Sequence, residues 1–392
     1  MLPERLCNFL CSLRPDEEKL CYSVIFDIDD DAVVHAWRLV HTVIKSNRRY
    51  AYEEVQEIID DIPSSPTPQE NTCEEAITIL NSLAQKLREQ RFAGGSVNLE
   101  TEEMKFRLDD KGRPVSVYYK QSTEATQLIE EFMLLANKRV AEKIGKKRTK
   151  DAEQNVFVYR IHDKPLEDKL ATFKNFVKKL GYDLNTKSTK TFSSSLNSML
   201  EAQKGKADYD MLSKLSIRIM ARACYSTENI GHYGLAFPFY THFTSPIRRY
   251  PDMMVHRLLD HYLAGKESVN QDQYEEYCKH CSQMEHQATE AERTSVKYKQ
   301  AEYLADKVGE VFDATVSGIS KWGIYAELTE SKCEGLIPMR CFDDDFYYID
   351  EENYTLVGLH HGRSLRFGDS IKVRVVAVDL IKKQMDFDIV RD

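Results

Sequence analysis

The feature that most constrains the fold of this 392-residue chain is a change of sequence pattern near residue 305. Before that point, several segments repeat apolar residues at steps of three and four, which predicts amphipathic helices. After it, β-rich segments alternate with short turns, as they do in a small closed barrel. We therefore expect an α+β protein with a mixed domain over residues 1–305 and an all-β barrel over residues 306–392.

Two β-rich segments stand apart from the helical pattern of the first domain. Residues 21–28 and 33–44 have the composition of strands, and the polar run DDDA between them predicts a hairpin turn. The strongest helical periodicity then covers five segments, at residues 72–90, 122–144, 165–181, 252–265 and 273–307.

The overall composition is that of an ordinary globular protein, with 42% hydrophobic and 30% charged residues. No run approaches the roughly 18 consecutive apolar residues of a membrane helix, so we expect no membrane-spanning segment. The N-terminus lacks the basic-then-apolar order of a secretory signal. Nine cysteines at irregular spacing are typical of reduced thiols. These features favour a cytoplasmic protein.

The net charge of −9 does not exclude a nucleic-acid partner, because a phosphate responds to the sign of the nearest surface. The segment 138–150 carries seven Lys or Arg against one Glu, and KSNRR at 45–49 forms a second basic cluster. Such clusters are often only solvated helix ends or loops. They support an RNA-binding function only if an RNA-binding module lies elsewhere in the chain.

The predicted barrel offers such a module on its surface. In SKWGIYAEL, Trp322 and Tyr325 flank a Gly-Ile step, with Lys321 beside them. Exposed aromatic side chains next to cations stack nucleic-acid bases, at about 1–3 kcal/mol for each base. In the alternative interpretation, both aromatic side chains fill the barrel interior.

The segment HFTSPIRRYPD at 242–252 carries the second functional signal. Ser245 can cap a helix that starts at Pro246, which places Arg248 and Arg249 in the first turn. A cation is unfavourable there, because the N-terminal end of the helix dipole is already positive. An anion bound to these arginines would explain the pattern, and an ion pair is the alternative. Pro251 also interrupts helical hydrogen bonding, so the arginines could instead lie on a short turn before the helix.

HFTSPIRRYPD resembles the signature of the RNB exoribonucleases, the family of ribonuclease II and ribonuclease R. Three other segments resemble the same family in the same order: MLPERLCNFLCSLRP at 1–15, IEEFMLLAN at 129–137 and RIHDKP at 160–165. The run 309–339 resembles the OB-fold RNA-binding domain of the S-one (S1) type, which such members carry at this place. The resemblance covers the entire chain and is nearest to ribonuclease R.

Members of this family degrade single-stranded RNA processively from the 3′ end to the 5′ end, and release nucleoside monophosphates with Mg²⁺ at a buried site. The resemblance implies that Arg248, followed by Arg249 in the motif, stabilises charge on the scissile phosphate. It also implies that Glu131 or Glu130 positions the terminal nucleotide. At about 100° per residue, Glu131 lies at the margin of the apolar face of its helix and Glu130 points away, which favours Glu131.

We expect RNA contacts from both domains. The resemblance implies those of the barrel, and those of the first domain would come from the extended segment that leads into the arginine motif, one face of which could instead meet the core. Pro338 departs from the pattern, because many S1 domains carry His at that position. The expected contacts are Tyr240, Thr244 and Ser245 in the first domain, and Trp322, Tyr325, Asp379 and Lys383 in the barrel.

The stretch FDIDDDA raises the question of metal binding. The family's Mg²⁺ site uses aspartates in the pattern Asp, five residues, Asp, one residue, Asp-Asp, since paired Mg²⁺ ions require several oxygen ligands. Asp27, Asp29 and Asp30 match the last three, but the first position is Cys21, a poor ligand for Mg²⁺. The family's carboxylate cluster also lies upstream of the segment that resembles residues 1–15. We therefore prefer the hairpin-turn interpretation.

This chain therefore resembles the C-terminal portion of a ribonuclease R that starts inside the catalytic domain. We expect it to bind single-stranded RNA, to lack the Mg²⁺ ligands, and to cleave poorly or not at all when alone. Its expected partner is a missing N-terminal half of the same enzyme. A non-catalytic RNA-binding protein is the alternative, and metal-dependent hydrolysis separates the two.

A weaker metal hypothesis concerns the long polar helix at 273–307. Cys278, His280, Cys281 and His286 are zinc-type ligands, but no second cysteine pair accompanies them and the segment has continuous helical periodicity.

Overall fold

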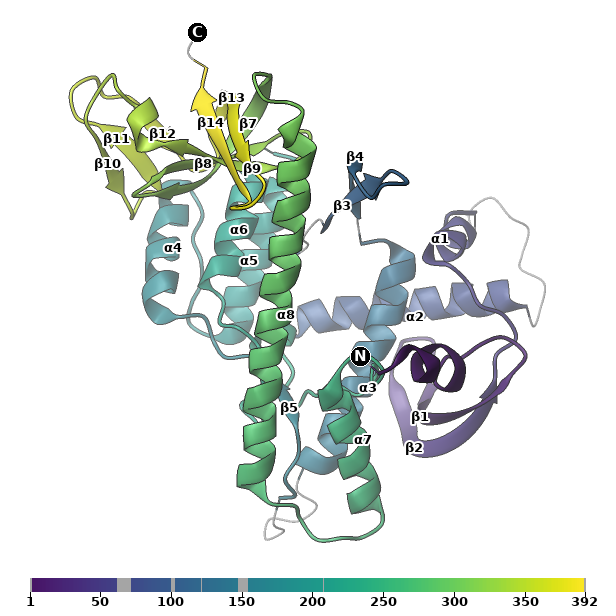
Figure 1. Cartoon of the computed structure of the whole chain (residues 1–392). Helices are drawn as coiled ribbons and strands as arrows, with labels where there is room; N and C mark the ends of the chain where they lie inside the picture. The colour runs from purple at the N-terminus through teal and green to yellow at the C-terminus, as the bar shows by residue number, and fades with distance from the viewer. Residues whose placement is uncertain are drawn as a thin grey trace.

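A computed structural model describes residues 2–61, 72–99, 103–120, 122–146, 154–206 and 208–390. One long helix, α8 (Gln271–Ala305), runs from the neighbourhood of α7 (Tyr250–Leu263) to the C-terminal barrel (Figure 1). The predicted basic cluster at 138–150 extends past the described residues, which end at 146 on this side. No helix in the described ranges combines the length and the apolar character that crossing a membrane requires.

The predicted N-terminal hairpin is confirmed. A short π-helical segment (Leu6–Leu10) precedes β1 (Glu18–Ile28), which pairs in antiparallel register with β2 (Val34–Lys45). Tyr22 on β1 stacks on His41 of β2, with 4.2 Å between the ring centroids. The Tyr22 ring also contacts Phe243 and His256 edge-on, at 5.5 and 5.3 Å, so the hairpin packs directly against the 242–252 segment and α7.

Two capped helices follow the hairpin and the short α1 (Tyr52–Asp61). The Thr72 side chain accepts a hydrogen bond from the Glu75 backbone at the start of α2 (Cys73–Ala93). Thr123 forms a capping box with Thr126 at the start of α3 (Glu124–Gly145). These side chains satisfy N–H groups that a helix N-terminus leaves without partners, which explains why the helices start there. The small hairpin of β3 (Glu103–Leu108) and β4 (Pro114–Lys120) connects α2 to α3.

Three helices form a separate bundle below the barrel (Figure 1). They are α4 (Glu167–Lys179), α5 (Thr189–Gln203) and α6 (Tyr209–Ile219), of which the sequence analysis identified only α4. Their apolar faces form one core that also takes in Phe367 from the barrel domain. An ion pair of 2.7 Å between Lys214 and Glu327 adds a polar contact between α6 and the barrel.

The central core lies where α3, α7 and α8 meet the two-stranded sheet of β5 (Tyr159–Ile161) and β6 (Cys224–Ser226). A 3-10 turn (Tyr233–Leu235) lies between β6 and α7. Phe157, Tyr159, Val255 and Leu258 are at most 1% exposed there. This core fixes the segment that carries the arginine motif.

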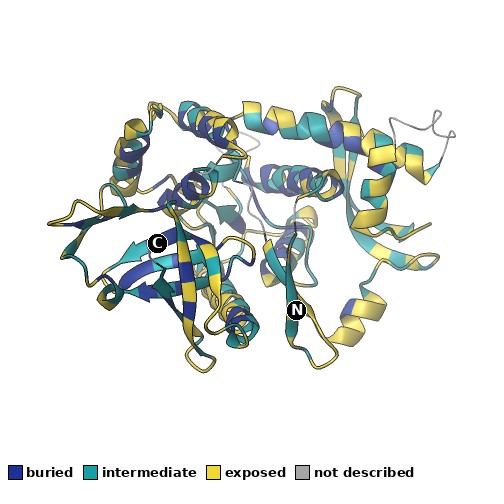
Figure 2. Cartoon of the chain, turned by 90° about the horizontal axis from the view of Figure 1, so that it is seen from above, coloured by how far each residue is buried: buried dark blue, intermediate teal, exposed yellow. Residues whose placement is uncertain are grey.

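The C-terminal domain is the predicted closed barrel. Its strands follow the order β13-β14-β9-β8-β7, with β9 and β14 parallel and the other neighbours antiparallel. Buried and exposed positions alternate along the strands, as Figure 2 shows near the C-terminus. The bounds are β7 (Val311–Ser320), β8 (Gly323–Leu328), β9 (Glu334–Pro338), β13 (Ser370–Asp379) and β14 (Gln384–Ile389).

An insertion between β9 and β13 adds a second, three-stranded sheet. It follows a 3-10 turn (Met339–Cys341) and consists of β10 (Tyr347–Asp350), β11 (Thr355–Gly358) and β12 (Ser364–Arg366). Leu356 of β11 belongs to the same apolar core as the barrel interior. The insertion therefore extends the barrel core outward, which the sequence pattern did not indicate.

Candidate functional site

The arginine motif adopts a turn followed by a helix. The backbone N–H groups of Arg248 and Arg249 donate to the Ser245 carbonyl at 3.3 and 3.0 Å, and α7 starts only at Tyr250. The expectation that Ser245 caps a helix starting at Pro246 is therefore wrong, and the alternative of a short turn is confirmed. Pro251 lies in the first turn of α7, where its missing N–H costs no helical hydrogen bond.

A buried carboxylate holds this turn. Asp252 is 0% exposed, and its Oδ1 accepts hydrogen bonds from the Ser245 backbone at 2.7 Å and from the Arg249 guanidinium at 2.8 Å. Asp252 Oδ2, Arg249 Nε and Thr244 Oγ1 are buried and have no hydrogen-bond partner in the described part of the chain. Arg249 is thus an ion-pair residue, but its partner is a buried carboxylate and not one on the surface.

Arg248 has a different environment from its neighbour. Its side chain is exposed and makes no hydrogen bond or ion pair within the described ranges. The turn holds the backbone of Arg248 in place through Ser245, while the guanidinium remains available to an external anion.

The side chains behind the turn are neutral and tightly packed. Tyr225 Oη and His242 Nδ1 lie 2.8 Å apart. Burial, reinforced by the Arg249 and Arg160 cations, lowers the pKa of His242 to about 2. Tyr240 is only 5% exposed, and its hydroxyl accepts a hydrogen bond from Asn137 at 3.3 Å. RNA contact by Tyr240 therefore stays a prediction that its burial does not favour.

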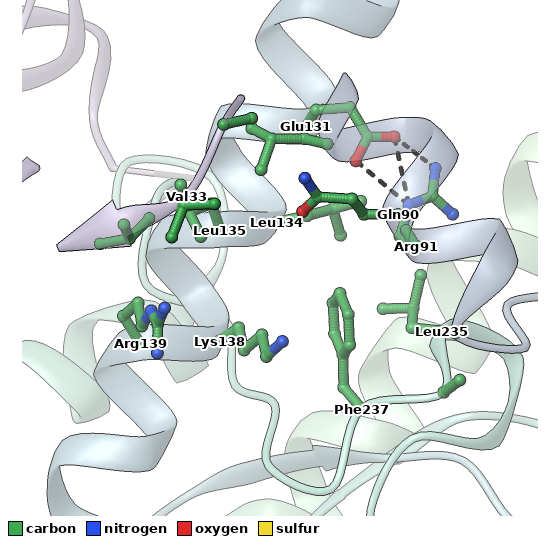
Figure 3. Close-up of a pocket in the computed structure, with 15 residues that line it drawn as sticks. Val33, Gln90, Arg91, Glu131, Leu134, Leu135, Lys138, Arg139, Leu235 and Phe237 are labelled. Atoms are coloured by element: carbon green, nitrogen blue, oxygen red, sulfur yellow. Dashed lines mark hydrogen bonds and ion pairs between the residues drawn. The ribbon is translucent and has the colours of Figure 1, made fainter. Parts of the chain in front are cut away.

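The two glutamates of α3 lie on different faces of the helix. Glu131 is 3% exposed, and Arg91 Nε donates to both of its carboxylate oxygens at 3.1 Å (Figure 3). Arg88 adds a second cation at 3.9 Å. Helix periodicity predicted that Glu131 lies nearer the apolar face than Glu130, and this is confirmed. Its carboxylate is already paired with Arg91. Arg91 was not among the predicted residues, because nothing in KLREQRF shows which of its two arginines faces α3.

Glu130 shares a helix face with Asn137, since seven residues make close to two helical turns. Asn137 Oδ1 accepts a hydrogen bond of 2.9 Å from the Phe243 backbone, so this face of α3 supports the segment that leads into the arginine motif. Glu130 is exposed and has no hydrogen bond or ion pair among the residues that the structure describes. Its carboxylate is the more accessible of the two.

Three of the FDIDDDA aspartates, Asp29, Asp30 and Asp31, form a hairpin turn. Asp29 Oδ1 accepts hydrogen bonds from the Asp31 and Val33 backbones at 3.0 and 2.9 Å, and Oδ2 lies 2.7 Å from His35. The Val33 backbone N–H and His35 hold the pKa of Asp29 below its usual range. Asp27 lies exposed on β1 opposite Ala36, outside the turn. No group of three or more His, Cys, Asp or Glu in the described ranges could hold a metal ion.

The geometry does not support a zinc site on α8 either. Cys278 is 0% exposed inside the central apolar core, against which Cys281 also packs. Burial raises the pKa of both thiols, which disfavours the thiolate that a zinc ion requires. Among the described residues, these side chains do not form a group of three or more ligands that could hold a metal ion.

The barrel presents the predicted aromatic surface. Trp322 is 65% exposed, and Lys321 Nζ lies 5.1 Å from its ring. Tyr325 is half-buried and alternates with the buried Ile324 and Ala326, so it points out of the barrel. The expectation that Trp322 and Tyr325 lie outside the barrel interior is confirmed, and their contact with RNA stays a prediction.

Backbone geometry fixes the position of this platform. Gly323 has φ of 144°, and a Cβ added there would lie 2.0 Å from the Ile337 carbonyl oxygen. Only glycine allows β8 to approach β9 this closely. Gly323 is the register partner of Pro338, the residue that departs from the family pattern.

Asp379 and Lys383 lie at the turn between β13 and β14. Asp379 Oδ1 accepts hydrogen bonds from the Ile381 and Lys382 backbones at 3.0 and 2.9 Å, so this side chain shapes the turn. Lys383 has φ of 55° and completes the turn. Their RNA contacts remain predictions.

Comparison with known proteins shows relatives along the whole chain. The model of the RNB domain matches residues 1–265, and that of the S1 RNA binding domain matches residues 305–389. Ribonuclease R of Thermotoga maritima is 38% identical over 400 residues, covering 100% of this chain and 55% of the relative. Ribonuclease R of Aquifex aeolicus is 34% identical over 393 residues, with 100% and 55% covered. The chain thus spans about half the length of these relatives.

A solved structure shows the same fold. Mycoplasma genitalium RNase R in complex with ribose methylated single-stranded RNA superposes with a TM-score of 0.89 at 26% sequence identity, covering 99% of this chain and 60% of that chain. The double-stranded RNA complex of the same protein has a TM-score of 0.79 at 24% identity.

Proposed function

This chain belongs to the RNB family, and from that premise we propose that it binds single-stranded RNA and contributes the phosphate-binding part of a 3′-to-5′ exoribonuclease that releases nucleoside 5′-monophosphates. The exposed guanidinium of Arg248 carries the proposal. It belongs to a turn that Asp252 and Arg249 hold from inside, so the cation is positioned without being neutralised.

Arg248 has the chemistry that the scissile phosphate requires. A guanidinium can donate two parallel hydrogen bonds to phosphate oxygens, and it stabilises the negative charge that develops as the phosphodiester is attacked. Arg249 acts through Arg248, because its own guanidinium is bound to Asp252. Ser245 has the same supporting role, through its backbone carbonyl.

Glu130 is the better candidate for positioning the terminal nucleotide. The accessible carboxylate of Glu130 can accept hydrogen bonds from ribose hydroxyls, whereas the Glu131 carboxylate already accepts those of Arg91. This choice reverses the preference that helix periodicity alone suggested.

The barrel supplies a second RNA-binding surface at Trp322 and Tyr325. Bases stacked there would hold the strand by contacts that do not depend on sequence. Mycoplasma genitalium RNase R, which shares this fold, was solved in complex with ribose methylated single-stranded RNA, and this supports an RNA partner for the present chain.

Divalent metal ions are generally required by RNB ribonucleases, but the residues present here do not fit such a site. Asp29 uses both carboxylate oxygens within its own turn, and Asp27 lies on a strand outside that turn. We therefore propose that hydrolysis needs carboxylates from another polypeptide segment. Alone, the chain acts as an RNA-binding protein, which is the second candidate function.

The test incubates the purified chain with Mg²⁺ and a radiolabelled single-stranded RNA that has a 3′ tail, and measures bound RNA and released mononucleotides. We expect binding that prefers the single strand over a duplex of the same sequence, without mononucleotides. Absence of RNA binding would refute the proposed function. Mononucleotides that disappear in Asp29→Asn would show instead that the turn binds metal.

A further inference from the structure

A cavity of about 410 Å³ lies beside α3, on the side that carries Glu131, Leu134 and Lys138. It is enclosed by the β1–β2 turn, α2, α3 and the segment 235–237 (Figure 3). None of residues 242–252 lines it, so it is distinct from the site around Arg248. The lining side chains that matter below are Val33, Leu134, Leu135, Lys138, Leu235 and Phe237.

The cavity contains a cation without an anionic partner of its own. Lys138 makes no hydrogen bond or ion pair within the described part of the chain, and its ammonium lies 4.7 Å from the centre of the Phe237 ring. Burial lowers the pKa of Lys138, although the nearby Glu142 carboxylate partly offsets this effect. An anion entering the cavity would therefore meet a poorly hydrated ammonium.

The surrounding charges do not neutralise Lys138. Glu142 already pairs with Arg139 at 3.0 Å and with Lys146 at 3.3 Å, so three cations surround one carboxylate. The other acidic group in the lining, Glu131, is bound to Arg91. Together these pairs leave an excess of positive charge beside the cavity.

The lining also includes the polar side chains of Gln90, Arg91, Glu131 and Arg139, and the remaining side chains form an apolar part that suits a flat ring. Leu134, Leu135 and Leu235 contribute aliphatic surface, and the Phe237 ring projects into the space (Figure 3). A pocket of roughly 300–1,000 Å³ that combines apolar walls with polar groups at fixed positions is typical of small-molecule sites. An inorganic anion alone would leave the apolar part unfilled.

We propose that this cavity binds a nucleoside 5′-monophosphate, with the phosphate at Lys138 and the base against the leucine and Phe237 side chains. Other ring-bearing anions would also suit this cavity. The choice of a nucleotide rests on the proposed function, because the exoribonuclease reaction releases nucleoside 5′-monophosphates. The site then holds a product molecule on the side of α3 that carries Glu131.

The experiment titrates the full chain with AMP, adenosine or inorganic phosphate by calorimetry, without RNA or metal. We expect saturable AMP binding, with adenosine and phosphate each weaker by about tenfold or more. Lys138→Met should weaken AMP binding by about tenfold or more, because it removes a charge-assisted contact but keeps an unbranched chain beside Phe237.

Three variants serve as controls. Lys143→Met removes the same charge from α3, but Lys143 lies over Trp37 and outside the cavity, so AMP binding should not change. Trp322→Ala tests whether AMP stacks on the barrel instead, because a loss of the saturable binding in this variant would place AMP at Trp322 and not at Lys138. Val33→Phe narrows the cavity from its exposed rim and should weaken binding, which provides an independent test if Lys138→Met folds poorly.

Several results would overturn the inference. They are an absence of saturable binding up to about 10 mM AMP, equal affinity for AMP and inorganic phosphate, equal losses in the Lys138 and Lys143 variants, or a loss on Trp322→Ala. Because no RNA is present, a chain that binds AMP through Lys138 but fails to bind RNA would refute the proposed function and leave this site in place.

Discussion

Two neighbouring arginines in this protein have opposite environments, and burial explains the difference. Arg249 is directed at Asp252, a fully buried carboxylate that would be very unfavourable without a cation and hydrogen-bond donors. Arg248 is exposed and keeps its charge for another partner. Identical side chains one residue apart thus have different roles: Arg249 stabilises the turn, and Arg248 is available for binding.

The same contrast between Glu130 and Glu131 gives a prediction about stability and binding. Glu131→Gln should lower the free energy of unfolding by about 3 kcal/mol, because it leaves the buried Arg91 guanidinium without its carboxylate. Glu130→Gln should change stability by less than about 0.5 kcal/mol, since the side chain is exposed, and should weaken RNA binding. Urea denaturation and RNA titration of both variants provide the measurements.

A double variant supplies the control for that experiment. Arg91→Met combined with Glu131→Leu removes both charges and should recover most of the lost stability, as apolar replacements of buried ion pairs often do. If Glu131→Gln weakened RNA binding without loss of stability while Glu130→Gln had no effect, the original preference for Glu131 would be restored.

Among the elements, the three-stranded insertion β10–β12 depends on one carboxylate. The Asp345 side chain is 0% exposed and accepts hydrogen bonds from the backbones of Phe346, His360 and His361, at 2.7 to 3.1 Å. Burial raises the pKa of Asp345, but these backbone donors outweigh it and lower the pKa to about 2. Asp345 thereby ties the start of the insertion to the segment between β11 and β12.

The lowered pKa predicts how stability depends on pH. The pKa of Asp345 is lower in the folded chain than its ordinary value of 3.8, so the ionised carboxylate stabilises the fold. This contribution to stability is complete above pH 3.8 and disappears as the pH falls towards 2. Asp345→Asn should therefore be less stable than the unmodified chain at neutral pH, and the difference should shrink between these two values.

Thermal unfolding across this pH range measures the effect, with Asp110→Asn as the control, since Asp110 is an exposed aspartate in the β3–β4 turn. A stability difference that stayed constant from pH 5 to about 2 would show that Asp345 is not the titrating group.

At the scale of the whole molecule, α8 joins two surfaces that we propose for RNA. Its last turn contributes Ala301 and Leu304 to the barrel core, and its first half carries Cys278 in the core behind the arginine motif. The two cores are thus connected by one continuous helix (Figure 1). A single strand that contacts both surfaces would combine an electrostatic contact at Arg248 with stacking at Trp322.

These two contributions should differ in their response to salt. Each single-strand phosphate contact adds about −0.7 to the slope of log affinity against log salt concentration, so Arg248→Ala should reduce the steepness by about that amount. Trp322→Ala should cost about 1–3 kcal/mol of binding free energy, because stacking on its ring is lost, and should leave the slope unchanged. Fluorescence anisotropy with a labelled single-stranded RNA measures both quantities.

Arg257→Ala is the matched control, because Arg257 is an exposed arginine on α7 outside the turn. If it reduced the slope as much as Arg248→Ala, the effect would reflect net charge and not a specific phosphate contact. A slope change in Trp322→Ala would equally contradict the division between stacking and charge.

The sequence by itself determined the elements whose signal is local. The alternation of β8 residues predicted which side chains point into the barrel, and the polar run after Ile28 predicted the hairpin turn. Periodicity also located α2, α3, α4, α7 and α8. Short-range patterns suffice for these elements because each depends on the period of its own backbone.

Only the tertiary structure decided which charged side chains are available. The pairing of Arg249 with Asp252 depends on how a turn folds back over α7, and that of Glu131 with Arg91 on how α2 packs against α3. The cavity at Lys138 likewise requires four separate segments to meet. The cost of burying a charge is set by groups that are distant in sequence. No local pattern therefore distinguishes the exposed Arg248 from the paired Arg249, or the exposed Glu130 from the paired Glu131.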